Sequence, residues 1–256
     1  MKIDKEKMVS KINDITCKTK DTVLTAKEKI ADKVSNFDSN ELIKQEDIVK
    51  LLDALYENVL NGLGKNSPSV EEFSEDYLRK EKTPSIAAKK MINNQILKCT
   101  TSGFISGFGG LITLPITIPA NVSSVLYVQM RMIASCAYMA GYDLKSDQVQ
   151  TFVYACLAGV SVSEVLKKTG INIGMKMATG AIKKIPGKAL TKINQKVGFR
   201  FVTKFGTKGV VNLGKIVPGV GAVFGGSLDY SETKIIGDRA YKWFFEGEFE
   251  SELEVK

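Results

Sequence analysis

ANVSSVLYVQMRMIASCAYMA, residues 120–140, decides the fold, because a mostly apolar run of this length that ends at a glycine predicts a buried helix. Arg131 is the one charged residue of the run. A buried charge without a partner is costly, so we expect a carboxylate such as Asp143 or Asp147 to pair with Arg131 in a structural role.

The apolar character extends upstream of this stretch. No Asp, Glu, Lys or Arg occurs from Cys99 to Met130, a run of 32 residues. The run is long enough to cross a bilayer, but Pro115 and Pro119 interrupt it after several glycines. We therefore expect the two prolines to bend the chain between two buried or interfacial helices. A strand at 111–118 is the alternative, since β-branched residues gather there, although the prolines oppose it.

Helical spacing of apolar residues recurs along the rest of the chain. The sequence predicts an all-α fold, a multi-helix globular bundle with glycine- and proline-broken hydrophobic helical hairpins and an N-terminal helical extension. The expected helices cover 3–35, a segment capped by Asp47 and stopped at 61–62, a segment opened by the capping box at 69–72, a segment after Thr83-Pro84, then 120–140, 146–168, pieces of 184–211 divided at Pro186, Gly198 and Gly206, and a last helix from Pro218 through Trp243.

Residue types that are missing exclude several kinds of chemistry. The chain contains no histidine, which excludes Ser-His-Asp and Cys-His nucleophiles, H-E-x-x-H zinc sites and histidine proton relays. Its four cysteines are far apart and form no C-x-x-C pair, a pattern typical of free thiols in a reducing cytosol. The N-terminus lacks the apolar run of a signal peptide. We expect a cytoplasmic protein, with peripheral attachment to a membrane as the alternative. We expect no enzymatic activity, cofactor or metal site.

The net charge of +8 is concentrated in one segment, since residues 165–228 carry 12 basic and no acidic side chains. Within 184–211 a base recurs every fourth residue and is followed by an apolar or small residue. On a helix each step of four advances by about 40°, so a basic ridge and an apolar ridge wind side by side. The anion-binding candidates are Lys183, Lys184, Lys188, Lys192, Lys196, Arg200, Lys204 and Lys208.

Three phenylalanines, Phe199, Phe201 and Phe205, interleave with these bases as candidates for apolar insertion or for the core. They alternate as a strand face would, which leaves a strand as the alternative to a helix. Repelling lysines four residues apart do not stabilise a helix, so the ridge is either a solubilising face or an anion-binding face.

These patterns favour reversible, non-enzymatic binding to an anionic membrane surface through residues 165–228. In one form of this hypothesis, the protein is an accessory to a membrane protein. A nucleic-acid-binding protein that uses the same bases and phenylalanines is the first alternative. A hydrolase that uses carboxylates at 71–76, or Asp143 and Asp147, is the second. The oligomeric state stays open.

Two motifs resemble those of a known family. The glycine- and proline-rich stretch from Gly109 to Asn121 is similar to a signature of EcsC family proteins, and the stretch from Val217 to Gly226, followed by Asp229, Thr233, Gly237 and Ala240, is similar to that family's closing motif. The resemblance covers about residues 80–245. It implies a bacterial, mostly helical, hydrophobic protein whose namesake is encoded beside an ABC transporter. It implies no activity and carries over no functional residue.

These observations together divide the chain into three parts. We expect a mixed-charge helical extension at 1–80 and an EcsC-like helical domain at 81–245, in which Pro115, Pro119 and Pro218 make structural bends. An acidic tail at 246–256 follows, and its glutamates at alternate positions are candidates to cover the basic ridge. These glutamates are Glu246, Glu248, Glu250, Glu252 and Glu254.

Overall fold

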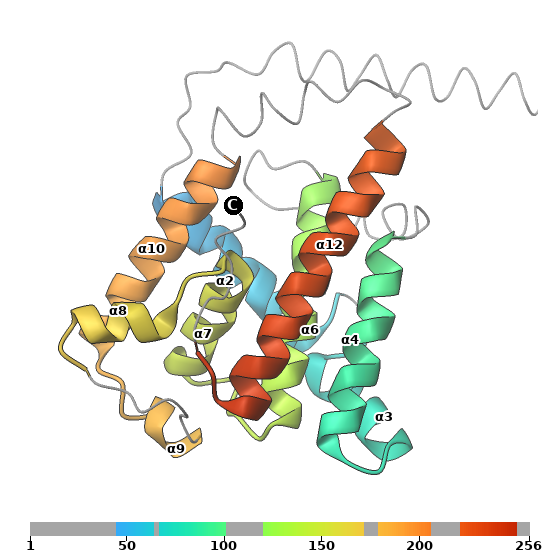
Figure 1. Ribbon diagram of the computed structural model, residues 1–256, viewed down its shortest axis with the longest axis horizontal. Coiled ribbons are helices and arrows are strands. Elements are labelled where there is room, and N and C mark those ends of the chain that lie inside the picture. The colour runs from blue at the N-terminus through green and yellow to red at the C-terminus, as the bar shows by residue number, and fades with distance from the viewer. Residues whose placement is uncertain (1–44, 64–66, 101–119, 172–178, 206–220, 250–256) are drawn as a thin grey trace, which may run out of the picture. The chain divides into compact units, whose positions relative to one another are not determined.

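The computed structural model describes residues 45–63, 67–100, 120–171, 179–205 and 221–249, all within one compact unit that spans Ile43–Lys256 (Figure 1). Every regular element in these ranges is a helix, which confirms the all-α prediction for the described part of the chain. The elements are α2 (Gln45–Asn61), α3 (Val70–Lys80), α4 (Pro84–Thr100), α6 (Ala120–Met139), α7 (Asp147–Ala158), α8 (Val162–Lys168), α9 (Thr179–Ile182), α10 (Gly187–Phe205), α12 (Gly221–Tyr241) and a π-helical turn, η1 (Lys242–Glu246).

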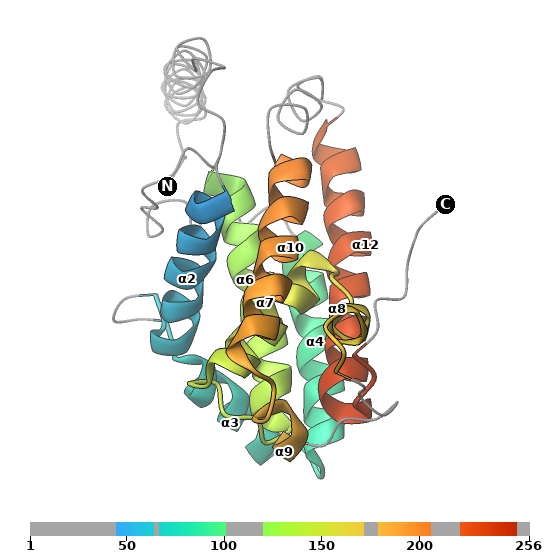
Figure 2. The ribbon, with the colours of Figure 1, turned by 90° about the vertical axis from the view of Figure 1, so that its left-hand side faces the viewer.

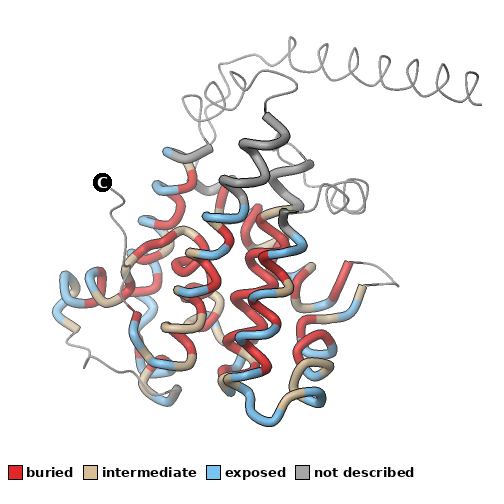
Figure 3. The backbone as a smooth tube through the Cα atoms, turned by 45° about the vertical axis from the view of Figure 1, so that its right-hand side comes forward, coloured by how far each residue is buried: buried red, intermediate tan, exposed pale blue. Residues whose placement is uncertain are grey.

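The predicted buried helix is α6, and it is the centre of the bundle. It packs against α2, α3, α4, α7 and α12. Every residue from Leu126 to Ala137 is buried, so α6 is covered all round rather than along one stripe. Helix α7 is likewise buried from Thr151 to Leu157, whereas α2, α3, α4 and α10 have buried positions toward the interior and exposed positions between them (Figure 3). This arrangement accounts for the apolar composition of residues 120–140.

Helix starts follow the capping signals of the sequence. Ser69 and Glu72 form the expected capping box, in which the Ser69 Oγ accepts from the Glu72 N–H at 3.1 Å and Glu72 Oε2 accepts from the Ser69 N–H at 3.0 Å. Thr83 Oγ1 accepts from the Ile86 N–H at 3.3 Å. Ser146 caps α7, with its Oγ accepting from the Val149 N–H at 3.3 Å.

The single helix expected over 146–168 was wrong. The chain leaves the helix at Gly159, whose φ of +67° is left-handed, and Ser161 then caps α8. The two helices are bent by 115°. By length and composition alone, the two helices together could form a broken membrane span. No single helix in the described ranges is long and apolar enough to cross a membrane.

The division expected at Gly198, and the strand considered around Phe199, were also wrong. Helix α10 runs without a break from Gly187 to Phe205, and Gly198 is buried within it. Tertiary packing explains why this glycine is tolerated, because α10 lies along α7 and α2 (Figure 2). Pro186 does precede the helix, as the sequence predicted.

The core extends beyond both boundaries expected from the sequence. Leu52 and Leu55 of α2 and Val70 of α3 are fully buried, so residues on the N-terminal side of position 80 belong to the same core. Phe249, placed in the acidic tail, is 4% exposed and packs against Trp243 and Phe152. The core therefore begins before residue 80 and continues past residue 245.

Several sequence predictions fall outside the described residues. These are the helix at 3–35, the bends at Pro115, Pro119 and Pro218, the strand considered at 111–118, the division at Gly206, the side chains of Lys204 and Phe205, and the residues Lys208, Glu250, Glu252 and Glu254.

Candidate functional site

Helix α10 carries the two ridges that its four-residue repeat predicts. The apolar ridge is buried, with Ile193, Val197 and Phe201 at 0%, 1% and 3% exposure. Lys188 and Lys192 of the basic ridge are exposed. The apolar ridge therefore supplies the contacts of α10 with α7 and α2, and the basic ridge is left at the surface.

The winding of the basic ridge brings its later members against the protein. Each four-residue step turns the ridge by about 40° toward the buried side of the helix. Accordingly, the Lys196 Nζ lies 3.8 Å from Glu164 Oε1 of α8, and the Arg200 Nη1 donates to the Gly159 carbonyl at 2.9 Å. The members of the basic ridge therefore have different surroundings. The first ones face outward, whereas Arg200 contacts the end of α7.

Four lysines between α9 and the first turns of α10 are exposed. Lys183, Lys184, Lys188 and Lys192 are exposed, and none of them forms an ion pair within the described part of the chain. Phe199 is 60% exposed and lies seven residues after Lys192, within about 20° of it around the helix axis. We call these four lysines and Phe199 the lysine face.

The three phenylalanines do not act together. Phe201 belongs to the hydrophobic core, whereas Phe199 is among the large apolar side chains that are exposed. Among the phenylalanines of this segment whose side chains are described, Phe199 is therefore the one that an external partner can contact. The same separation removes Phe201 from any platform for stacking bases.

Four of the six carboxylates weighed for hydrolysis have structural partners. Glu72 caps α3, Asp76 Oδ2 accepts from the Lys80 Nζ at 2.6 Å, and Glu75 Oε1 accepts from the Tyr138 hydroxyl at 2.9 Å. The hydrogen bond from Lys80 lowers the pKa of Asp76. Asp143 Oδ1 accepts from the Lys145 N–H at 3.0 Å. Within the described ranges, no three carboxylates or thiols come together as metal ligands would.

The partner expected for Arg131 was wrong. Arg131 is 5% exposed, and its guanidinium lies 4.3 Å from the ring centroid of Phe73 and 5.6 Å from that of Tyr127. Its Nε has no hydrogen-bond acceptor in the described part of the chain. A cation over desolvated aromatic faces is stabilised by about 2 kcal/mol, which takes the place of the expected carboxylate.

Cys136 and Cys156, the two cysteines whose side chains the structure describes, are free and fully buried. Burial raises the pKa of both thiols, to about 12 for Cys156, even though nearby Arg239 acts in the opposite direction on Cys156. Thiols with raised pKa values are poor nucleophiles near neutral pH, so these two cysteines have a packing role.

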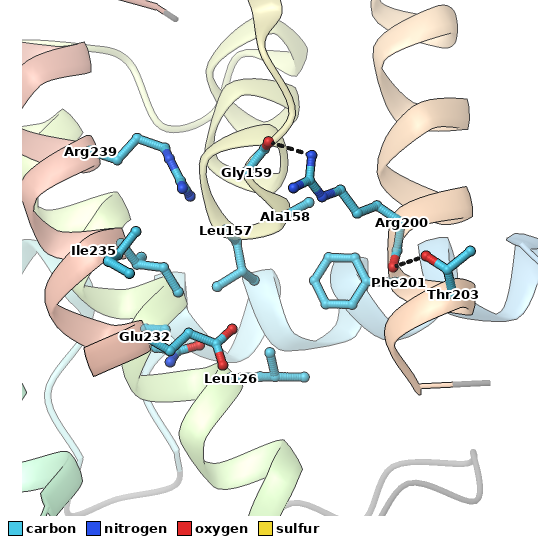
Figure 4. A pocket seen from close by; sticks show the side chains of 12 residues that line it. Leu126, Leu157, Ala158, Gly159, Arg200, Phe201, Thr203, Glu232, Ile235 and Arg239 are labelled. Carbon is cyan, nitrogen blue, oxygen red and sulfur yellow. Dashed lines mark hydrogen bonds between the residues drawn. The ribbon is translucent and has the colours of Figure 1, made fainter. Parts of the chain in front are cut away.

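A pocket of about 330 Å³ lies where α6, the end of α7, α10 and α12 meet (Figure 4). Arg200 and Arg239 flank it, and the Arg239 Nη1 donates to the Cys156 carbonyl at 2.7 Å. The sequence prediction missed Arg239. The pattern that could have indicated Arg239 is the spacing of Glu232, Ile235 and Arg239, which places them on one face of α12.

The closing motif singled out in the sequence has a packing role. The Gln129 Nε2 donates to Thr233 Oγ1 at 3.0 Å, and both residues are buried between α6 and α12. Gly237 is so close to α4 that a Cβ atom there would lie 2.6 Å from the Ile92 Cγ2. These residues therefore hold α12 against α6 and α4, and they bring no reactive group into a site.

Comparison with known proteins gives one result. The sequence model of the EcsC protein family matches residues 4–244, a longer range than the 80–245 expected from the two motifs. No curated protein and no solved structure matches the chain. Because the family match covers most of the chain, the chain belongs to the EcsC protein family.

Proposed function

We propose that this protein binds reversibly to anionic membrane surfaces through the lysine face. The observation that carries the proposal is the group of exposed lysines at 183–192 that have no ion pair in the described residues, followed two turns later on α10 by the exposed Phe199. Anionic lipids attract such a row, and an aromatic side chain among the lysines can enter the headgroup region. No enzymatic step is part of the proposal.

The charges set the strength of this binding. Each lysine near an anionic surface contributes about 1 kcal/mol, so the four lysines contribute about 4 kcal/mol together. Burying the exposed part of Phe199 adds about 1–2 kcal/mol. The sum of about 5–6 kcal/mol corresponds to a dissociation constant between about 0.04 mM and 0.2 mM, and salt weakens the electrostatic part. Association of this strength is reversible, and a membrane protein nearby would strengthen it by adding a second contact.

Co-sedimentation with lipid vesicles tests the proposal. We expect binding to vesicles that contain phosphatidylglycerol, weaker binding at higher salt, and little binding to phosphatidylcholine alone. The double substitution Lys188→Gln and Lys192→Gln removes about 2 kcal/mol, so affinity should fall roughly thirtyfold. Equal binding to both kinds of vesicle, or to neither, contradicts the proposal.

A matched variant controls for net charge. Lys82 is exposed just before α4, and Lys89 is exposed on α4 with its Nζ 4.6 Å from the Tyr241 ring centroid; α4 lies on the side of the bundle away from α10 (Figure 1). Replacing both with Gln changes the net charge by the same amount but leaves the lysine face intact, so vesicle binding should stay near that of the wild type. A polynucleotide added as a competitor tests the first alternative. Binding to polynucleotide without binding to vesicles would replace membrane binding with nucleic-acid binding.

A further inference from the structure

The pocket beside α7 combines charged and apolar walls. Leu157 and Phe201, which are 5% and 3% exposed, line it together with the aliphatic side chains of Ile235 and Ile236. Figure 4 shows the side chains of Arg200 and Arg239 on either side of Leu157 and Gly159. The volume of about 330 Å³ lies within the range of pockets that take small organic ligands.

The end of α7 holds both arginines in place. The Arg239 Nη1 donates to the Cys156 carbonyl at 2.7 Å, and the Arg200 Nη1 donates to the Gly159 carbonyl at 2.9 Å. The carbonyls at the C-terminal end of a helix carry partial negative charge and can accept further hydrogen bonds, so they fix the two guanidinium groups. Gly159 also allows a close approach, because a Cβ atom there would lie 3.2 Å from the Arg239 Nη1.

The two arginines are close enough for their positive charges to interact. Burial lowers the pKa of Arg239, and the charge of Arg200 lowers it in addition. Neither arginine forms an ion pair in the described ranges. A guanidinium has five N–H donors, and each of these side chains uses one of them in its contact with α7. Donors therefore remain on both arginines for an anion.

Glu232 lines the pocket away from the two arginines. It precedes Arg239 by seven residues on the same face of α12, which places the two residues about 10 Å apart along the helix. The two arginines therefore mark the end of the pocket that attracts an anion, and Glu232 lies toward the other end. Apolar side chains line the space between these ends.

We propose that this pocket binds an amphiphile with an anionic head group, a carboxylate or a phosphate monoester, and an apolar chain. The head group lies between Arg200 and Arg239, and the chain packs against Leu157, Phe201 and Ile236. An anion in this position relieves the repulsion between the two guanidinium groups and accepts their free N–H donors. The ligand comes either from the membrane or from solution.

The pocket and the lysine face are separate sites. Arg200 belongs to the basic ridge in sequence, but its contact with Gly159 assigns it to the pocket, while Lys188 and Lys192 face outward. Ligand binding in the pocket therefore does not depend on the proposed function, and either proposal can fail without the other.

Isothermal titration calorimetry on the full chain tests the proposal with four probes, decanoate, decyl phosphate, decan-1-ol and inorganic phosphate. We expect the first two to bind and to raise the Tm, because they supply both the anion and the chain. Decanol and inorganic phosphate each lack one part and should bind at least tenfold more weakly. Decanol binding as tightly as decanoate, or no binding by any probe, would overturn the proposal.

Substitutions locate the binding in the pocket. Arg200→Gln removes one charged donor from an exposed position, so decanoate affinity should fall between tenfold and a hundredfold. Ala158→Leu narrows the pocket without changing charge and should weaken decanoate in the same way. The variant with Gln at positions 188 and 192 should bind decanoate as the wild type does. An unchanged affinity in both pocket variants would overturn the assignment.

Vesicles separate the two sources of the ligand. If the amphiphile comes from the membrane, phosphatidylglycerol vesicles doped with decanoate should retain more protein than undoped ones, and Arg200→Gln should abolish the difference. If it comes from solution, decanoate should bind the protein equally well with and without vesicles. Both results support the pocket, and a difference that persists in Arg200→Gln contradicts it.

Discussion

Replacing Gly237 with Ala tests the packing of α12 on α4. A Cβ atom at this position would lie 2.6 Å from the Ile92 Cγ2 and 3.5 Å from the Met132 Cε. Ile92 is 5% exposed, and its Cγ2 is attached directly to Cβ, so it cannot move away by a change at the end of a flexible side chain. The two helices must therefore separate, or the Ile92 side chain must leave its rotamer.

Two opposing terms set the magnitude. Overpacking a core by one methyl group costs about 1–3 kcal/mol, and the contact of 2.6 Å puts this site in the upper part of that range, at about 2–3 kcal/mol. The higher helix propensity of Ala recovers about 1 kcal/mol. We expect Gly237→Ala to lower the free energy of unfolding by about 1–2 kcal/mol and the Tm by about 2–8 °C.

Chemical denaturation and thermal unfolding measure the effect, and a second glycine provides the control. Gly187, at the start of α10, has no heavy atom within 4 Å of the position of an added Cβ. Gly187→Ala should therefore be neutral or stabilising by up to about 1 kcal/mol. Adding Ile92→Ala to Gly237→Ala should cost less than the sum of the single changes, because the new methyl group fills part of the cavity. A Gly237→Ala protein as stable as the Gly187→Ala protein would refute the close approach of α12 and α4.

Three further outcomes follow from contacts in the described core. Thr233→Val should lower the free energy of unfolding by about 1–3 kcal/mol, because it leaves the buried Gln129 amide without its acceptor, and the loss should shrink when Gln129→Leu is added. With the other two cysteines replaced by Ser, Cys136 and Cys156 should resist alkylation at pH 8 until the protein unfolds. Because their folded pKa values lie above the unfolded value of about 9, the Tm should fall as pH rises above 9, and it should fall less when both are Ala. Deleting residues 250–256, which spares the buried Phe249, should strengthen vesicle binding at low salt if the glutamates cover the lysine face, and an unchanged affinity would show that they do not.

Local signals predicted most of the helices. Ser69, Thr83 and Ser146 begin helices where the sequence placed their caps, because a capping bond spans only three residues. The break after α7 had a local signal too, since Ser161 is followed three residues later by Glu164, and the Ser161 Oγ accepts from the Glu164 N–H at 3.2 Å. That signal was outweighed by the continuous helical spacing of apolar residues on both sides of the break.

Contacts between distant helices were not predictable from one sequence. Phe73, which lies under the guanidinium of Arg131, is on another helix, and nothing in the local pattern favours it over a carboxylate. The ridge on α10 was predictable as a pattern, but the assignment of Arg200 to the end of α7 depends on where α7 ends. The pocket needs four elements to meet, so its residues were recognisable singly and not as a set.

The repeat on α10 has a consequence for how this sequence can vary. A repeat of four on a helix of 3.6 residues per turn gives successive members different neighbours, so identical bases are under different constraints. At Lys188 and Lys192 any cation should serve, and Arg and Lys should interchange. At position 200 a planar fork reaches a carbonyl, and Lys should be a poor substitute. An inserted residue near the start of α10 would rotate everything after it by about 100°, moving bases toward the core. This helix should therefore accept many substitutions while rejecting insertions and deletions.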